Sequence, residues 1–136
     1  MNESIGFSAK MSQFRVLSTN ERVPFDDVIT NFGGHYNADT YLFTCPVHGV
    51  YTFTMATNQY DHDNIQTGLL RNEEIIIRVA AEREAYRDSS SATIITECNA
   101  GDSVYVRVLL GGRFEGEGGV YNPCHFSGYL LHKFYK

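Results

Sequence analysis

The chain has 136 residues, of which 43% are apolar and 20% are charged, and its formal net charge at pH 7 is −5. This length fits a single domain with a real core, and the composition excludes a disordered chain; no apolar run approaches the roughly 20 residues that cross a bilayer. The acidic balance also argues against a nucleic-acid-binding surface, which needs clustered lysine and arginine.

The predicted elements are short strands, beginning near the N-terminus. Phe7, Ala9 and Met11 alternate with polar residues, which predicts a first strand. Residues 14–17 extend this strand or begin a bend, and residues 31–37 are dense in turn formers. We therefore assign residues 1–5 to an N-terminal tail and residues 6–136 to one globular domain.

The most regular stretch is residues 49–55, which follows a short predicted strand at residues 41–44. Side chains of an extended strand alternate between two faces, so Tyr51, Phe53 and Met55 are expected to share one face. The aromatic character of that face predicts a half-buried strand, which a polar loop at residues 58–64 follows.

The second half of the chain continues the pattern. Strands are predicted at residues 65–70, 75–79, 92–98, 104–109 and 126–131, the first two forming a hairpin. Residues 79–87 are good helix formers without an apolar stripe, so we interpret them as a strand end and a long loop with at most one helical turn. Nine or ten short strands without a helix predict an all-β sandwich.

The spacing of aromatic residues and glycines resembles the signature of the globular C1q domain. The matching positions are Phe25, Asn31, Tyr36, Phe43, Gly49, Tyr51 and Phe53, with Phe126 and Gly128 in a closing strand typical of the family. Met55 stands where the family has Phe or Tyr, which we interpret as a repacked core because methionine is an adaptable apolar side chain. Within the family, the chain resembles the compact C1q-domain proteins of invertebrates.

The resemblance implies a ten-stranded jelly-roll β-sandwich of the C1q and tumour necrosis factor type that assembles as a homotrimer. It further implies a secreted, extracellular, non-enzymatic protein of innate immunity that binds microbial polysaccharide or other repeating ligands. The alternatives are a trimeric cytokine-like or adhesion ligand of a cell-surface receptor, and a trimerisation head of a longer collagen-like chain. No nucleophile or phosphate-binding motif indicates an enzyme.

Two acidic stretches raise the question of a cation. Residues 61–63 (Asp-His-Asp) carry oxygen and nitrogen donors, but neighbours in a strand point apart, so a solvated loop is favoured. The resemblance implies a calcium site with Asp88 as one ligand and Glu82 or Glu84 as another. Their spacing departs from that of the family, and a solvated acidic loop is the alternative.

Ligand contacts are expected in loops carried by the rigid sandwich. Residues 111–119 are rich in glycine and predict an exposed tip that presents Arg113, Phe114 and Glu115. A sugar site also needs aromatic side chains, and Tyr60, Tyr86 and Tyr121 are candidates because they fall in predicted loops.

The three cysteines are an odd count for a secreted protein. In the jelly roll implied by the resemblance, Cys45 and Cys98 lie at the same end of the sandwich and Cys124 at the other. Either Cys45 and Cys98 form a disulfide and Cys124 is free, or all three are unpaired.

Overall fold

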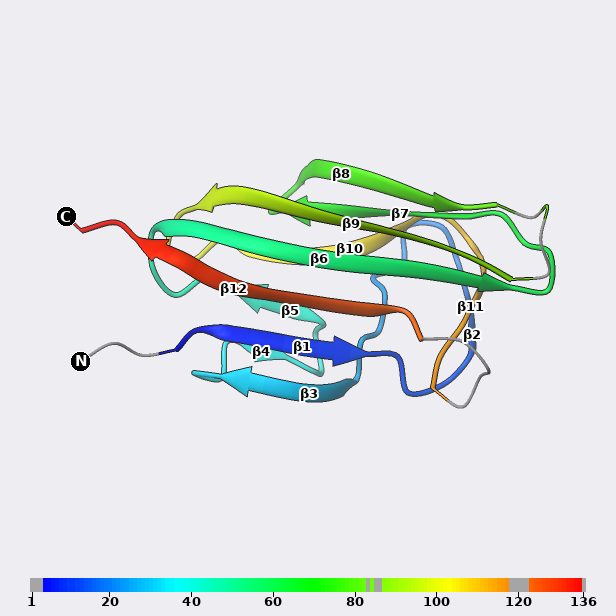
Figure 1. The fold of residues 1–136 in the computed structure, drawn as a ribbon, viewed down its shortest axis with the longest axis horizontal. Coiled ribbons are helices and arrows are strands. Elements are labelled where there is room, and N and C mark those ends of the chain that lie inside the picture. The colour runs from blue at the N-terminus through cyan, green and yellow to red at the C-terminus, as the bar shows by residue number, and fades with distance from the viewer. Residues whose placement is uncertain (1–3, 83, 85–86, 118–122, 136) are drawn as a thin grey trace.

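The computed structural model describes residues 4–82, 84, 87–117 and 123–135. These residues form twelve strands and no helix, so the predicted all-β fold is confirmed (Figure 1). The strands are β1 (Gly6–Lys10), β2 (Arg15–Leu17), β3 (Asp27–Phe32), β4 (Tyr36–Asn37), β5 (Leu42–Thr44), β6 (Gly49–Tyr60), β7 (Ile65–Arg71), β8 (Glu74–Ala81), β9 (Arg87–Cys98), β10 (Ser103–Leu110), β11 (Gly112–Phe114) and β12 (His125–Lys133). The very short β4 and β11 lie in segments predicted as turn and loop.

The strands form two antiparallel sheets that pack face to face as a jelly roll. The seven-stranded sheet has the order β2-β11-β6-β12-β1-β3, with β9 on the other edge of β6, and the five-stranded sheet has the order β4-β5-β10-β7-β8. In Figure 1, β9, β6, β12, β1 and β3 run side by side, and the start of β1 lies at the same end as the finish of β12. The predicted β7–β8 hairpin is confirmed.

The core lies between the sheets and is built from the signature positions. Tyr51, Phe53 and Met55 are all buried, as the alternation predicts, and Met55 fills its place in the core. The ring of Phe126 lies 6.3 Å from that of Phe53 and meets that of Phe7 edge-on at 4.8 Å. Such aromatic pairs stabilise a core beyond the area that they bury.

Two signature glycines are required by close approach. A Cβ atom at Gly128 would collide with the ring of Phe53, and one at Gly49 would collide with the carbonyl oxygen of His132. Both positions therefore fix the contact of β6 with β12.

Asn31 and Tyr36 hold the turn between β3 and β4. The Asn31 side chain donates to the Tyr36 carbonyl at 2.8 Å and accepts from the Tyr36 amide at 3.1 Å. The buried Tyr36 hydroxyl donates to the Phe25 carbonyl at 2.7 Å. The signature residues in this segment therefore have structural roles.

Two predicted boundaries are wrong. β6 runs to Tyr60, so Asn58 and Gln59 are buried strand residues and not part of a polar loop. β9 begins at Arg87, several residues before the predicted start, because it pairs with β6 along its whole length. The helix-forming stretch ends β8 at Ala81 and begins β9, and none of its described residues is helical.

Within the described ranges, no helix is long and apolar enough to cross a membrane.

Candidate functional site

The described part of the glycine-rich segment, residues 111–117, is not an exposed tip. Its first part is β11, which pairs with β2 and with the end of β6. Phe114 is 0% exposed and Glu115 is 1% exposed, so the prediction that they face a ligand is wrong. β11 closes the end of the sandwich, and that closure draws Phe114 into the core.

Arg113 of this strand is partly exposed, and it is tied to the loop after β6. Its amide donates to Asp63 Oδ2 at 2.7 Å, and its guanidinium lies 3.6 Å from the same carboxylate. Asp61 and His62 are exposed and adopt positive φ angles, so this loop is solvated, as favoured from the sequence. Asp63 faces β11 instead of forming a cation site with its neighbours.

Of the candidate tyrosines, only Tyr60 lies within the described residues; Tyr86 and Tyr121 lie outside them. The ring of Tyr60 packs edge-on against that of Phe14, with 4.8 Å between centroids. Its role in sugar binding stays a prediction.

The acidic residues considered for calcium do not converge. Asp88 lies in β9, and its Oδ2 accepts a hydrogen bond from the Glu82 amide at 2.8 Å. The side chains of Glu82 and Glu84 are exposed, and the described residues contain no group of three His, Cys, Asp or Glu side chains able to hold a metal ion. Calcium binding therefore stays a prediction.

Cys45 and Cys98 lie together at one end of the sandwich as buried free thiols. The hydrogen bond between them raises the pKa of Cys45 and lowers the pKa of Cys98, which Arg71 lowers further. Cys124 is at the other end, where burial raises its pKa to about 12. The expected placement is confirmed, and the disulfide itself stays a prediction.

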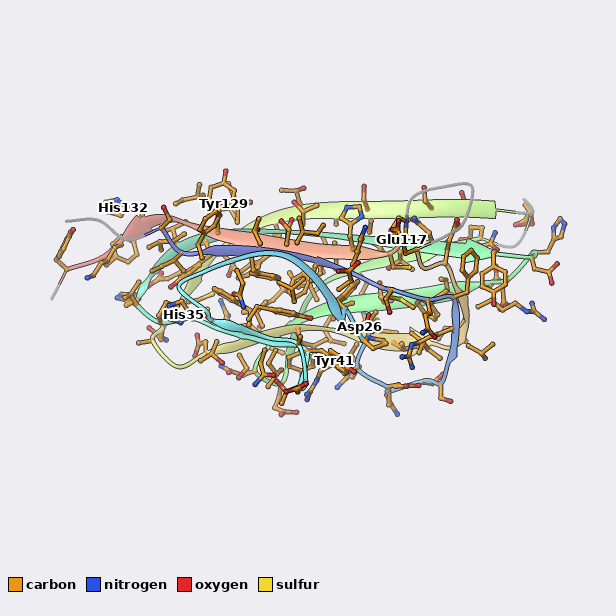
Figure 2. The ribbon with its side chains drawn as sticks, turned by 90° about the horizontal axis from the view of Figure 1, so that it is seen from below. Asp26, His35, Tyr41, Glu117, Tyr129 and His132 are labelled. Atoms are coloured by element: carbon orange, nitrogen blue, oxygen red, sulfur yellow. The ribbon has the colours of Figure 1, made fainter. Side chains whose placement is uncertain are left out.

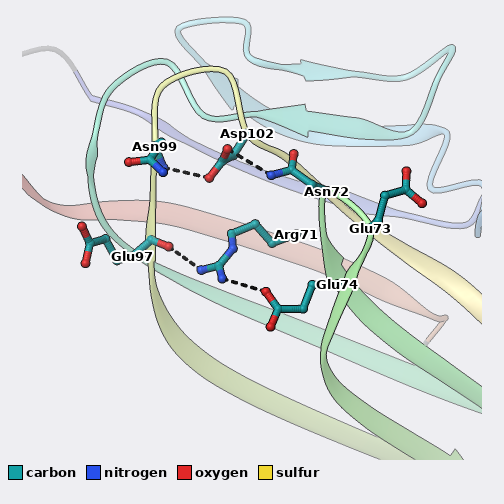
Figure 3. Close-up of a pocket in the computed structure, with 7 residues that line it drawn as sticks. All are labelled: Arg71, Asn72, Glu73, Glu74, Glu97, Asn99 and Asp102. Atoms are coloured by element: carbon teal, nitrogen blue, oxygen red, sulfur yellow. Dashed lines mark hydrogen bonds and ion pairs between the residues drawn. The ribbon is translucent and has the colours of Figure 1, made fainter.

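A surface hollow of about 660 Å³ lies where the β7–β8 and β9–β10 turns meet (Figure 3). It is lined by Arg71, Asn72, Glu73, Glu74, Glu97, Asn99 and Asp102. Arg71 donates to the Glu97 carbonyl at 2.6 Å and to Glu74 at 3.0 Å, while Asp102 accepts from the Asn72 side chain and the Asn99 amide. Because these groups satisfy one another, the network fixes the two turns.

The outer face of the seven-stranded sheet carries a row of exposed apolar side chains. Register places five residues side by side across five strands, in the order Ile95, Thr52, Tyr129, Gly6 and Phe32. Ile95 is 63% exposed, Tyr129 is 54% exposed and Phe32 is 56% exposed. Figure 2 shows Tyr129 on the side of this sheet that faces away from the core. We refer to Ile95, Tyr129 and Phe32 as the apolar row.

The same face becomes polar away from the apolar row. The next row carries a hydroxyl on each of the five strands: Thr93, Thr54, Ser127, Ser8 and Thr30. Beyond it, Lys10 Nζ lies 2.9 Å from Glu117 and 3.8 Å from Asp27. The outer face of this sheet therefore changes from apolar at one end to ionic at the other. A protein interface uses these two kinds of surface to exclude water and to orient a partner.

Sequence reasoning missed the apolar row. Alternation in residues 92–98 and 126–131 identifies Ile95 and Tyr129 as outward-facing, but their alignment with Phe32 depends on the pairing of five strands. Only the register brings them together.

Comparison with known proteins gives a family match over most of the chain. The C1q domain model matches residues 6–131. Complement C1q tumor necrosis factor-related protein 2 of Mus musculus is 32% identical over 95% of this chain and 46% of its own length. Complement C1q and tumor necrosis factor-related protein 9 of the same species is 34% identical over 69% of this chain and 28% of its own length. The chain thus spans less than half the length of these relatives.

Solved structures show the same fold at low identity. The globular domain of zebrafish complement 1qA protein superposes with a TM-score of 0.73 at 17% identity, covering 96% of this chain and 99% of that chain. Eiger TNF from S. frugiperda superposes with a TM-score of 0.77 at 14% identity, covering 99% of this chain and 97% of that chain. Murine APRIL superposes with a TM-score of 0.72 at 12% identity, covering 96% of this chain and 100% of that chain.

Proposed function

Because the chain belongs to the C1q domain family, we propose that it is a secreted recognition protein that works as a homotrimer and binds repeating ligands through several protomers at once. The ligands proposed are microbial polysaccharides or other glycans displayed in many copies. No enzymatic step is part of this function.

The apolar row is the observation that carries the proposal. Three large apolar side chains, each more than half exposed, share one row on the outer face of the seven-stranded sheet. Isolated exposed apolar residues are ordinary, but residues gathered on one face mark an interaction site. A cyclic trimer buries such a face because each protomer presents it to the next and the ring closes.

Trimer formation gives the recognition mechanism. One domain with a weak site for a sugar holds a ligand briefly, whereas three linked sites make the second and third contacts effectively intramolecular. Repeating ligands are therefore bound far more tightly than single copies. This is the physical advantage of the assembly for detecting a glycan surface.

A trimeric cytokine-like ligand of a cell-surface receptor is the second candidate. It is supported by the relatives named as tumor necrosis factor-related proteins and by the shared fold of Eiger TNF and APRIL. Such a ligand would bind one protein receptor and ignore glycans.

The test is the solution mass by light scattering, followed by binding to immobilised glycans and whole bacteria. We expect a mass of three 15.4 kDa chains and an avidity for glycans that is lost when the trimer is dissociated. A stable monomer, or a trimer that binds a receptor and no glycan, contradicts the proposal. Repeating the measurement with a calcium chelator tests the calcium prediction separately, since loss of the trimer would reveal a bound cation.

A further inference from the structure

Three arginines lie in one row across the outer face of the five-stranded sheet. Arg107 of β10 pairs with Gly68 of β7, which pairs with Arg78 of β8. On the other side of β10, Arg22 forms a bridge directly opposite Arg107. We call Arg22, Arg107 and Arg78 the arginine row. Their neighbours in sequence, such as Val106 and Val79, point into the core, so all three arginines face outward.

No carboxylate neutralises this row within the described part of the chain. Arg22 donates from Nη1 to the Thr40 carbonyl at 2.8 Å, and its guanidinium lies 4.8 Å from the Tyr105 ring centroid. The Nε atoms of Arg22 and Arg107 are buried without a partner, so both stems lie flat on the sheet. Arg107 as a whole is partly exposed, and Arg78 is exposed.

Three other cations of this acidic protein form ion pairs with carboxylates. Lys10 contacts Glu117, Arg71 contacts Glu74 and Arg113 contacts Asp63. Like charges placed directly opposite one another on neighbouring strands destabilise a sheet. A row of unneutralised arginines in a chain of net charge −5 is therefore a local feature that an external anion would stabilise.

We propose that the arginine row binds an anionic polysaccharide, one whose sulfate or carboxylate groups recur along an extended chain. Guanidinium groups present planar donors that match such oxyanions, and recurring anions suit a linear row of cations. A protein partner fits less well, because protein interfaces centre on buried apolar anchors. Among the described residues, Leu110 is the one exposed large apolar side chain on a strand of this sheet.

This inference rests on the proposed function and narrows the class of its ligands from glycans in general to anionic polysaccharides. If the trimer forms through the apolar row of the seven-stranded sheet, the opposite sheet stays on the outside of the assembly. Each trimer then displays three arginine rows, and a long polyanion can contact more than one of them.

The experiment measures binding to immobilised heparin by wild-type protein, by R78Q, by R107Q and by the double variant. R15Q is the matched control, because Arg15 is an exposed arginine outside the row and its loss changes the net charge equally. We expect each row substitution to weaken binding about threefold to fivefold, and the double variant roughly tenfold or more, with R15Q unchanged. The slope of log affinity against log salt should fall by about one for each row arginine removed.

The probes also separate the alternatives. Neutral dextran should not bind, and polyglutamate should bind more weakly than heparin. If wild type, R78Q and R15Q bind heparin equally well, the arginine row is not the binding site. If the row arginines are needed to bind polyglutamate and the protein does not bind heparin, the ligand is not an anionic polysaccharide. Because R78Q alters an exposed side chain, its mass and unfolding midpoint should match those of wild type. A trimer that binds neutral glycans and not heparin overturns this inference alone, whereas a monomer overturns the proposed function.

Discussion

Replacing Ile95 with aspartate should dissociate the trimer without unfolding the protomer. Burying an isoleucine side chain completely stabilises an interface by about 1.5 to 3 kcal/mol, and Ile95 is 63% exposed in the single chain. Its burial in the trimer should therefore contribute about 1 to 2 kcal/mol per protomer. An aspartate in its place must also lose water, which costs several kcal/mol for an unpaired charge. Over three protomers the destabilisation is roughly 10 kcal/mol or more.

The assay is light scattering of Ile95→Asp at micromolar protein concentration, with urea unfolding to confirm that the protomer is folded. Leu110→Asp is the matched control, because Leu110 is an exposed apolar residue at 41% exposure on the other sheet. We expect a monomer for Ile95→Asp and an unchanged trimer for Leu110→Asp. A trimer that persists in Ile95→Asp would refute the placement of the interface on this face.

Three further outcomes follow from the buried contacts. Tyr36→Phe removes the donor to the buried Phe25 carbonyl at 2.7 Å, and urea unfolding should show a loss of about 1 to 3 kcal/mol; a loss near zero would mean that the carbonyl finds another donor. Burial raises the pKa of Asp26, but two hydrogen bonds from Ser12, one from its own backbone and the charge of Arg15 together lower it more, so it lies below its ordinary value of 3.8. The ionised Asp26 therefore stabilises the folded state at pH values above 3.8, and this stabilisation is lost as the pH falls through the folded pKa. Asp26→Asn should lower the free energy of unfolding at pH 7, and the difference between the variant and wild type should shrink in acid. A difference that does not change with pH contradicts this. If Cys45 and Cys98 are bridged in the native protein, thiol titration in denaturant should count one free thiol before reduction and three after, whereas three at the start would exclude the bridge.

The core residues of β6 could be predicted from the sequence because side chains alternate between the two faces of a strand. Tyr51, Phe53 and Met55 follow a period of two, and any pairing that buries one of them buries all three. Spaced glycines such as Gly128 were likewise readable, because a close approach tolerates no side chain. Local pattern and tertiary packing agree at these positions.

Local preference failed where strand pairing decided the outcome. In the stretch of good helix formers, residues 79–81 end β8 and Arg87 begins β9, since pairing with β7 and β6 satisfies their backbone groups. The glycine-rich segment looked exposed, yet Phe114 is a core residue because β11 closes the end of the sheet. Asp88 was expected in a loop, but it lies in β9 because that strand pairs with β6 as far as this residue.

The sequence by itself determined the family, the all-β architecture and the burial of the signature aromatic residues such as Tyr51 and Phe53, because spacing along one strand is a local property. The tertiary structure alone decided which residues share a surface. Arg22, Arg78 and Arg107 are far apart in the chain, as are Phe32, Ile95 and Tyr129, and each set becomes one row only through the register of several strands. A shift of one residue in any pairing would turn a member of either row to the opposite face.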